Sequence, residues 1–120
     1  MITTQPDIRY EPLYMVGEAA RYLKIPENTL RYWTLGRGGS GPIIRRPDGG
    51  RERLMSFMNL VEAHNLFSLT KGRNVHLREI RKGLDYIFEY LAMDIHEHPL
   101  ANLGLFTDGK SLIVEHLAAR

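Results

Sequence analysis

The sequence predicts a mainly α-helical protein with short β-hairpins. Apolar residues recur at helical spacing near the N-terminus and, most regularly, over residues 77–91. Two turn signals, Pro-Asp-Gly-Gly at 47–50 and Asp-Gly at 108–109, each stand between short apolar stretches, which is the pattern of a hairpin. We therefore expect a helical chain with one hairpin before residue 57 and a second hairpin near the end.

Two short helices are predicted within residues 14–33. One helical face carries Val16, Ala19, Ala20 and Leu23. Pro26 disfavours a helical conformation at the residue before it, so a turn should follow. A second helix then opens at Glu27 and points Leu30 and Trp33 inward. Two helices, a tight turn and a contact through small residues predict a helix-turn-helix, preceded by a loose arm over residues 1–13.

A hairpin is predicted directly after these two helices. The glycines between 36 and 41 mark a loop, and residues 43–46 and 53–56 flank the first turn signal. A hairpin in this place is a wing, so residues 14–56 are predicted to form a winged helix-turn-helix.

The remaining chain divides into two predicted parts. Ser56 is a good N-cap for a third helix that Lys71-Gly72 should end, and the periodic residues 77–91 form a fourth helix. Residues 57–95 are therefore expected to make a helical hairpin packed on the winged unit. Residues 96–120 should contain the second β-hairpin, with arms at 105–107 and 111–114.

Composition excludes several classes of protein. The chain has no cysteine, so disulfides and thiolate metal sites are excluded. It has no signal-peptide pattern and no apolar run of the roughly 20 residues that span a bilayer, which favours a soluble cytoplasmic protein with no membrane partner. The formal charge is only +2, but residues 37–53 hold five arginines against two acids. The basic excess therefore follows the helix-turn-helix, where a polyanion could bind.

The N-terminal residues resemble a known family. The matching stretches are VGEAARYL (16–23), IP (25–26) and TLRYW (29–33). They resemble the winged helix-turn-helix of MerR-like regulators, in which the second helix and the wing contact DNA.

The continuation resembles VapB-type antitoxins that carry a MerR-like N-terminal domain before a small domain of unassigned function. The matching stretches are SF (56–57), LVE (60–62), VHLREIR (75–81), HPL (98–100) and FTDGK (106–110). The resemblance implies an antitoxin that neutralises a VapC-type PIN-domain ribonuclease and represses its own operon, usually as a homodimer. Such antitoxins commonly continue well beyond 120 residues, so toxin-binding residues can lie outside this sequence. His76 departs from the usual hydroxyl cap of the fourth helix.

Nine residues are candidate DNA contacts. Four lie on the second helix and could reach base edges in the major groove: Asn28, Thr29, Arg31 and Tyr32. Five arginines follow. Arg37 could bond a phosphate, and the four arginines of the predicted wing suit phosphate or minor-groove contact: Arg45, Arg46, Arg51 and Arg53. The alternative is that Asn28 and Thr29 only favour the first helical turn, and that the arginines are ordinary solvated charges.

Other clusters carry less information. A second basic group could extend the DNA footprint, meet an acidic toxin, or be a solvated helix start: Lys71, Arg73, Arg78, Arg81 and Lys82. The five histidines lack metal-ligand spacing, and no nucleophile motif or phosphate-binding loop is present. We therefore predict no enzyme, no metal and no cofactor.

The sequence favours a DNA-binding antitoxin that binds operator DNA. Two alternatives stay open. One is a MerR-like regulator that responds to a small molecule, which would require an apolar pocket with convergent polar groups. The other is a protein-interaction adaptor whose helix-turn-helix no longer binds DNA.

Overall fold

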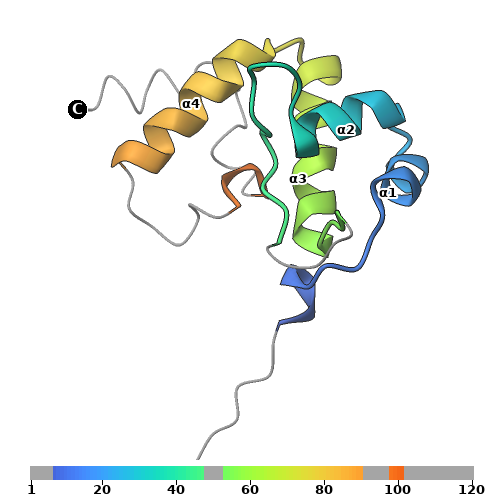
Figure 1. Cartoon of the computed structure of the whole chain (residues 1–120). Helices are drawn as coiled ribbons and strands as arrows, with labels where there is room; N and C mark the ends of the chain where they lie inside the picture. The colour runs from blue at the N-terminus through green and yellow to red at the C-terminus, as the bar shows by residue number, and fades with distance from the viewer. Residues whose placement is uncertain (1–6, 48–52, 91–97, 102–120) are drawn as a thin grey trace, which may run out of the picture. The chain divides into compact units, whose positions relative to one another are not determined.

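The computed structural model describes residues 7–47, 53–90 and 98–101 (Figure 1). The chain divides into two compact units, Met1–Val61 and Glu62–Arg120. The boundary between them falls inside helix α3, which runs over Phe57–Phe67. Each unit is described separately.

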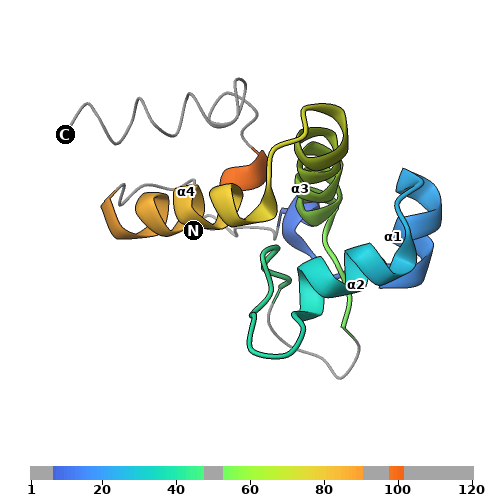
Figure 2. The ribbon, with the colours of Figure 1, turned by 90° about the horizontal axis from the view of Figure 1, so that it is seen from above.

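The first unit is built on helices α1 (Val16–Leu23) and α2 (Glu27–Leu35), which pack against each other (Figures 1 and 2). Their contact is close because the α1 side contributes the small, buried side chains of Ala19 and Ala20. Lys24 ends α1 in the left-handed conformation, with a φ of 59°, and Pro26 precedes the first residue of α2. The predicted helix-turn-helix is confirmed.

Helix α1 begins at Val16 without a serine, threonine, asparagine or aspartate at its N-cap position. Its N-cap is Met15, whose backbone N–H donates to the Glu18 carboxylate at 3.0 Å. Glutamate at the third helical position thus satisfies the backbone N–H of the N-cap residue, as the glutamate of a capping box does.

The predicted β-hairpins are wrong for the described residues, none of which forms a β-strand. The two arms of the expected wing bond to different partners. The amides of Ile43 and Ile44 both donate to the Trp33 carbonyl, at 2.8 and 2.9 Å. Met55 instead exchanges two backbone hydrogen bonds with Tyr14. The arms therefore satisfy their backbone groups on α2 and on the chain before α1 rather than on each other.

A tight turn follows α2. Gly36 has a φ of +83°, and the backbones of Arg37 and Ser40 exchange two hydrogen bonds of 2.9 Å. A Cβ atom at Gly36 would stand 2.6 Å from the Ser40 carbonyl oxygen. Both the backbone angle and the close approach therefore require glycine at this position.

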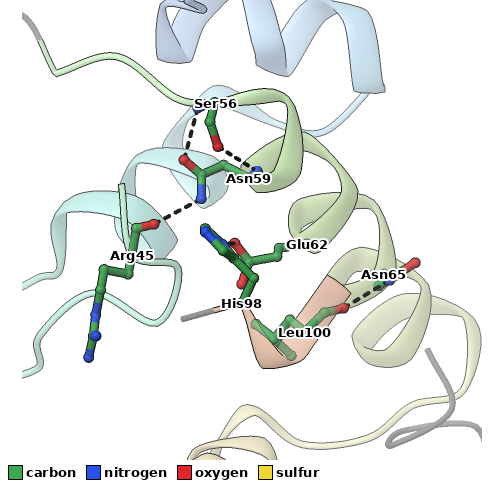
Figure 3. Close-up of polar contacts among 7 residues, drawn as sticks. All are labelled: Arg45, Ser56, Asn59, Glu62, Asn65, His98 and Leu100. Atoms are coloured by element: carbon green, nitrogen blue, oxygen red, sulfur yellow. Dashed lines mark hydrogen bonds and ion pairs between the residues drawn. The ribbon is translucent and has the colours of Figure 1, made fainter. Parts of the chain in front are cut away.

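Ser56 and Asn59 form the N-terminal cap of α3 (Figure 3). The Ser56 hydroxyl accepts the Asn59 N–H at 3.1 Å, and the Asn59 side-chain oxygen accepts the Ser56 N–H at 2.9 Å. The predicted Ser56 cap is confirmed. The Asn59 amide nitrogen also donates to the Arg45 carbonyl at 2.9 Å, so one buried side chain ties the segment after α2 to α3.

The second unit contains the rest of α3, a π turn at Ser68–Gly72, helix α4 (Leu77–Tyr90) and a short 3-10 turn at Pro99–Ala101. Among its described residues, the buried apolar side chains include Leu66, Leu69, Ile80, Leu84 and Leu100. The third helix was predicted to end at Gly72 in the left-handed conformation. That conformation is instead adopted by Asn74, with a φ of 58°.

Buried polar groups tie α3 to residues 98–101 in this unit (Figure 3). The Asn65 amide donates to the Leu100 carbonyl at 2.8 Å, and the Glu62 carboxylate lies 3.0 Å from His98 Nδ1. The predicted C-terminal hairpin at 105–114 lies outside the described residues, and the predicted domain limits remain predictions. Across the described part of the chain, no helix combines the length and the apolar character needed to cross a bilayer.

We expect Gly36→Ala to destabilise the protein by more than about 1 kcal/mol, because it adds a Cβ where φ is positive and space is absent. Gly41→Ala is the matched control, since a Cβ there meets nothing within 4 Å. Urea unfolding of both variants measures the difference. Equal stability of the two variants would contradict the turn geometry.

Asn59→Ala should lower the free energy of unfolding by at least about 2 kcal/mol, because the Ser56 N–H and the Arg45 carbonyl both lose their hydrogen bond to the Asn59 side chain. Ser56→Ala removes one capping bond and should cost only about 1 kcal/mol. Thermal unfolding of the two variants tests this order. A smaller loss for Asn59→Ala than for Ser56→Ala would show that the bond to Arg45 contributes nothing.

Candidate nucleic-acid interface

Helix α2 turns one face inward and leaves the other open to a partner. Leu30, Trp33 and Thr34 are buried, and Leu30 is fully inaccessible to solvent. The four candidate residues lie on the remaining surface: Asn28 and Arg31 are exposed, whereas Thr29 and Tyr32 are half-buried. The second helix of a helix-turn-helix reads DNA with such an outward face.

Arg31 is held by an acid on its own helix. Its Nε and Nη2 atoms donate to the same Glu27 oxygen, Oε2, at 2.8 and 2.6 Å. The two residues stand four apart with the acid first, which is the favourable order for a helical ion pair. The other carboxylate oxygen of Glu27 lies near Gly17 of α1. A Cβ atom added to Gly17 would be 3.4 Å from this oxygen.

Arg37 stacks on the helix that precedes it. Its guanidinium carbon lies 5.0 Å from the centroid of the Tyr32 ring, within the range of a cation–π interaction. The tight turn at 37–40 fixes the backbone from which this side chain extends. The structure therefore brings two of the predicted residues, Tyr32 and Arg37, into one cluster at the C-terminal end of α2.

Two further arginines are anchored by neighbouring helices, Arg45 by α3 and Arg46 by the C-terminal end of α2. The Arg45 carbonyl accepts from Asn59 while its side chain extends away from that bond (Figure 3). Arg46 Nε donates to the Thr34 carbonyl at 3.3 Å, where the last carbonyls of α2 favour a positive charge. Arg46 thus has a structural role at the end of α2 that the sequence did not indicate.

Arg46 and Arg53 influence each other electrostatically. Burial lowers the pKa of Arg46, and the positive charge of Arg53 lowers it further. The like charges of Arg46 and Arg53 therefore repel each other. A bound anion would relieve that repulsion.

Several of these residues line one groove of about 570 Å³. It runs between the N-terminal end of α1, helix α2 and residues 53–54. Three arginines line it, Arg21, Arg31 and Arg53, together with the carboxylates of Glu18 and Glu27. Sequence reasoning missed Arg21 and gave Glu27 no role beyond the helix N-terminus. The spacing of Glu27 and Arg31 was a readable signal for their pairing, whereas nothing local pointed to Arg21.

Other predicted residues lie elsewhere. Arg51 lies outside the described residues. The second basic cluster belongs to the second unit, where Lys71, Arg73, Arg78 and Lys82 are exposed and Arg81 is half-buried. Within the described ranges, no three histidine or carboxylate side chains are grouped so that they could hold a metal ion.

A second groove, of about 480 Å³, has a more aromatic lining. Tyr14, Tyr22 and Phe57 contribute to it, along with Leu60 and Ala19. Tyr22 is strongly exposed for an aromatic residue, at 81%. Its charged neighbours are Glu18 and Arg21, which also line the first groove.

Comparison with known proteins identifies the family. Residues 14–87 match the MerR HTH family of regulatory proteins, which is more than half of the chain. A Mycobacterium tuberculosis protein named "Putative antitoxin VapB45" is 30% identical over 120 residues, covering 89% of this chain and 48% of that protein. A crystal structure of Rv2018 from the same organism superposes with a TM-score of 0.63 and 31% identity, covering 90% of this chain and 48% of that chain.

These matches confirm the resemblance to VapB-type antitoxins with a MerR-like helix-turn-helix. The chain spans about half the length of the relatives it matches. The match over residues 14–87 covers both helices of the helix-turn-helix and the groove beside them. The chain belongs to the MerR helix-turn-helix family of regulatory proteins.

Proposed function

We propose that this chain is a DNA-binding antitoxin that binds operator DNA and represses its own operon. The observation that carries the DNA-binding half is the groove beside α2, where Arg21, Arg31 and Arg53 converge on the outward face of a MerR-family helix-turn-helix. Convergent arginines beside a recognition helix suit a duplex, because phosphates supply most of the affinity while base edges supply specificity.

In this proposal α2 enters the major groove. Asn28, Thr29, Arg31 and Tyr32 face the base edges, as the sequence predicted. The flanking arginines contact the phosphate backbone: Arg37, Arg45, Arg46, Arg51 and Arg53. Arg46 keeps one donor on the Thr34 carbonyl, so its remaining N–H groups are the ones available to a phosphate.

The antitoxin half of the proposal draws on the similarity to the VapB45 protein. The partner would be a VapC-type PIN-domain ribonuclease. The surface of the antitoxin that binds this nuclease lies in residues 96–120 or in the part of such proteins that this chain does not span. A homodimer would bind a two-fold symmetric operator, because a dimer presents two recognition helices to two half-sites.

Titration with a random-sequence DNA duplex at two salt concentrations tests the first half. We expect binding that weakens steeply with salt, and we expect Arg37→Ala/Arg53→Ala to reduce the slope of log K against log salt by about 2, since each phosphate contact contributes about 0.9. Arg9→Ala is the matched control, because Arg9 is an exposed arginine paired with Asp7 in the N-terminal arm. A wild-type protein that does not bind would favour the adaptor alternative.

Co-expression with a PIN-domain nuclease encoded in the neighbouring reading frame tests the second half. We expect the two proteins to elute together and the ribonuclease activity to fall to background at equimolar ratio. A nuclease that stays fully active and elutes alone would show that the chain has no antitoxin activity and acts as a regulator only. If DNA affinity then changed when a small apolar molecule occupied the groove at Tyr22, the ligand-responsive alternative would replace the proposal.

A further inference from the structure

The ion pair between Glu27 and Arg31 constrains how Arg31 can meet DNA. The Nε and Nη2 edge of the guanidinium is occupied by Glu27 Oε2. The other carboxylate oxygen of Glu27 lies near Gly17 of α1, so this side chain has a neighbour on each of the two helices. What remains on Arg31 is its far edge, where Nη1 and Nη2 present two parallel N–H donors. Both side chains are about half exposed, so a partner can reach this edge.

We propose that Glu27 is a positioning residue that dedicates Arg31 to reading a guanine rather than contacting a phosphate. This inference rests on the proposed DNA-binding function and specifies how one residue of the interface acts. A guanine presents two acceptors, O6 and N7, side by side in the major groove, and an arginine with two parallel donors matches both.

Charge distinguishes the two possible targets. The Glu27–Arg31 pair has no net charge at neutral pH, and a phosphate placed on Arg31 would bring a second anion close to the Glu27 carboxylate. The two negative charges would repel each other. A guanine edge carries partial charges only, so it can accept both hydrogen bonds without that repulsion. Glu27 therefore favours the base over the backbone at this position.

The first experiment is selection of duplexes from a randomised library by the wild-type protein, Arg31→Ala and Glu27→Gln. We expect the DNA sequence selected by the wild-type protein to contain one guanine, and we expect the Arg31→Ala variant to show no base preference at that position. The wild-type protein should bind duplexes that carry this guanine about 5- to 150-fold more tightly than duplexes in which another base replaces it. Glu27→Gln should lower this ratio while keeping binding, because glutamine retains the length of the side chain but not its charge.

The second readout is the salt dependence of binding to the selected duplex. Arg31→Ala should leave the slope of log K against log salt unchanged, since a base contact releases no phosphate counterion. Glu27→Gln frees Arg31 to meet a phosphate and should steepen the slope by about 0.9. A purely structural role for Glu27 would move neither the slope nor the selected guanine.

Glu11→Gln is the control for loss of one negative charge, because Glu11 stands in the same unit outside both helices. Thermal unfolding of each variant confirms that it is folded. The inference is overturned if Arg31→Ala keeps the selected guanine and lowers the slope by about 1, which would place Arg31 on a phosphate while the proposed function stands. Failure of the wild-type protein to bind any duplex at low salt would overturn the proposed function itself.

Discussion

The carbonyl oxygen of Trp33 accepts hydrogen bonds from two consecutive amides, and the arginine-bearing segment depends on that junction. Ile43 and Ile44 are drawn back onto the C-terminal end of α2, and Ile44 becomes fully buried. The next residues continue along the same path, since Arg45 is held through Asn59 and Arg46 through Thr34. Hydrogen bonds of residues 43–46 therefore hold the arginine-bearing segment against α2 and α3. Loss of the Trp33 junction would release Ile43 and Ile44, the start of this segment, from α2.

The helix-turn-helix could be predicted because its signals are local. The apolar spacing in α1, the small residues Ala19 and Ala20, and Pro26 before α2 all act within a few residues of the structure they determine. The prediction of the wing failed because the hydrogen-bond partners of its two arms are not local in sequence. A turn signal at 47–50 says nothing about which distant backbone groups its flanking segments will find. Tyr14 lies far from Met55 in sequence, yet it supplies the hydrogen-bond partners that a neighbouring strand would have supplied.

The candidate site shows the same division. The outward direction of Arg31 follows from the burial of Leu30 and Trp33, which the helical period predicts. The stacking of Arg37 on Tyr32 depends on a turn whose geometry is fixed by Gly36 and by the Ser40 backbone, and no residue pattern encodes that distance. Arg21 lines the groove because α1, which carries it, packs against α2. Contacts that arise from packing between helices cannot be predicted from the spacing of residues in the sequence.

The Tyr32–Arg37 stack also has a thermodynamic consequence for recognition. An arginine side chain free in solution samples many rotamers, and immobilising such a side chain on binding costs about 0.5–1.5 kcal/mol. Arg37 is already restrained by the aromatic ring beneath it and by the closed turn behind it. Part of its conformational entropy is therefore lost during folding. A ligand that contacts Arg37 meets a preorganised cation, and its affinity is correspondingly less diminished by ordering than at a mobile surface arginine.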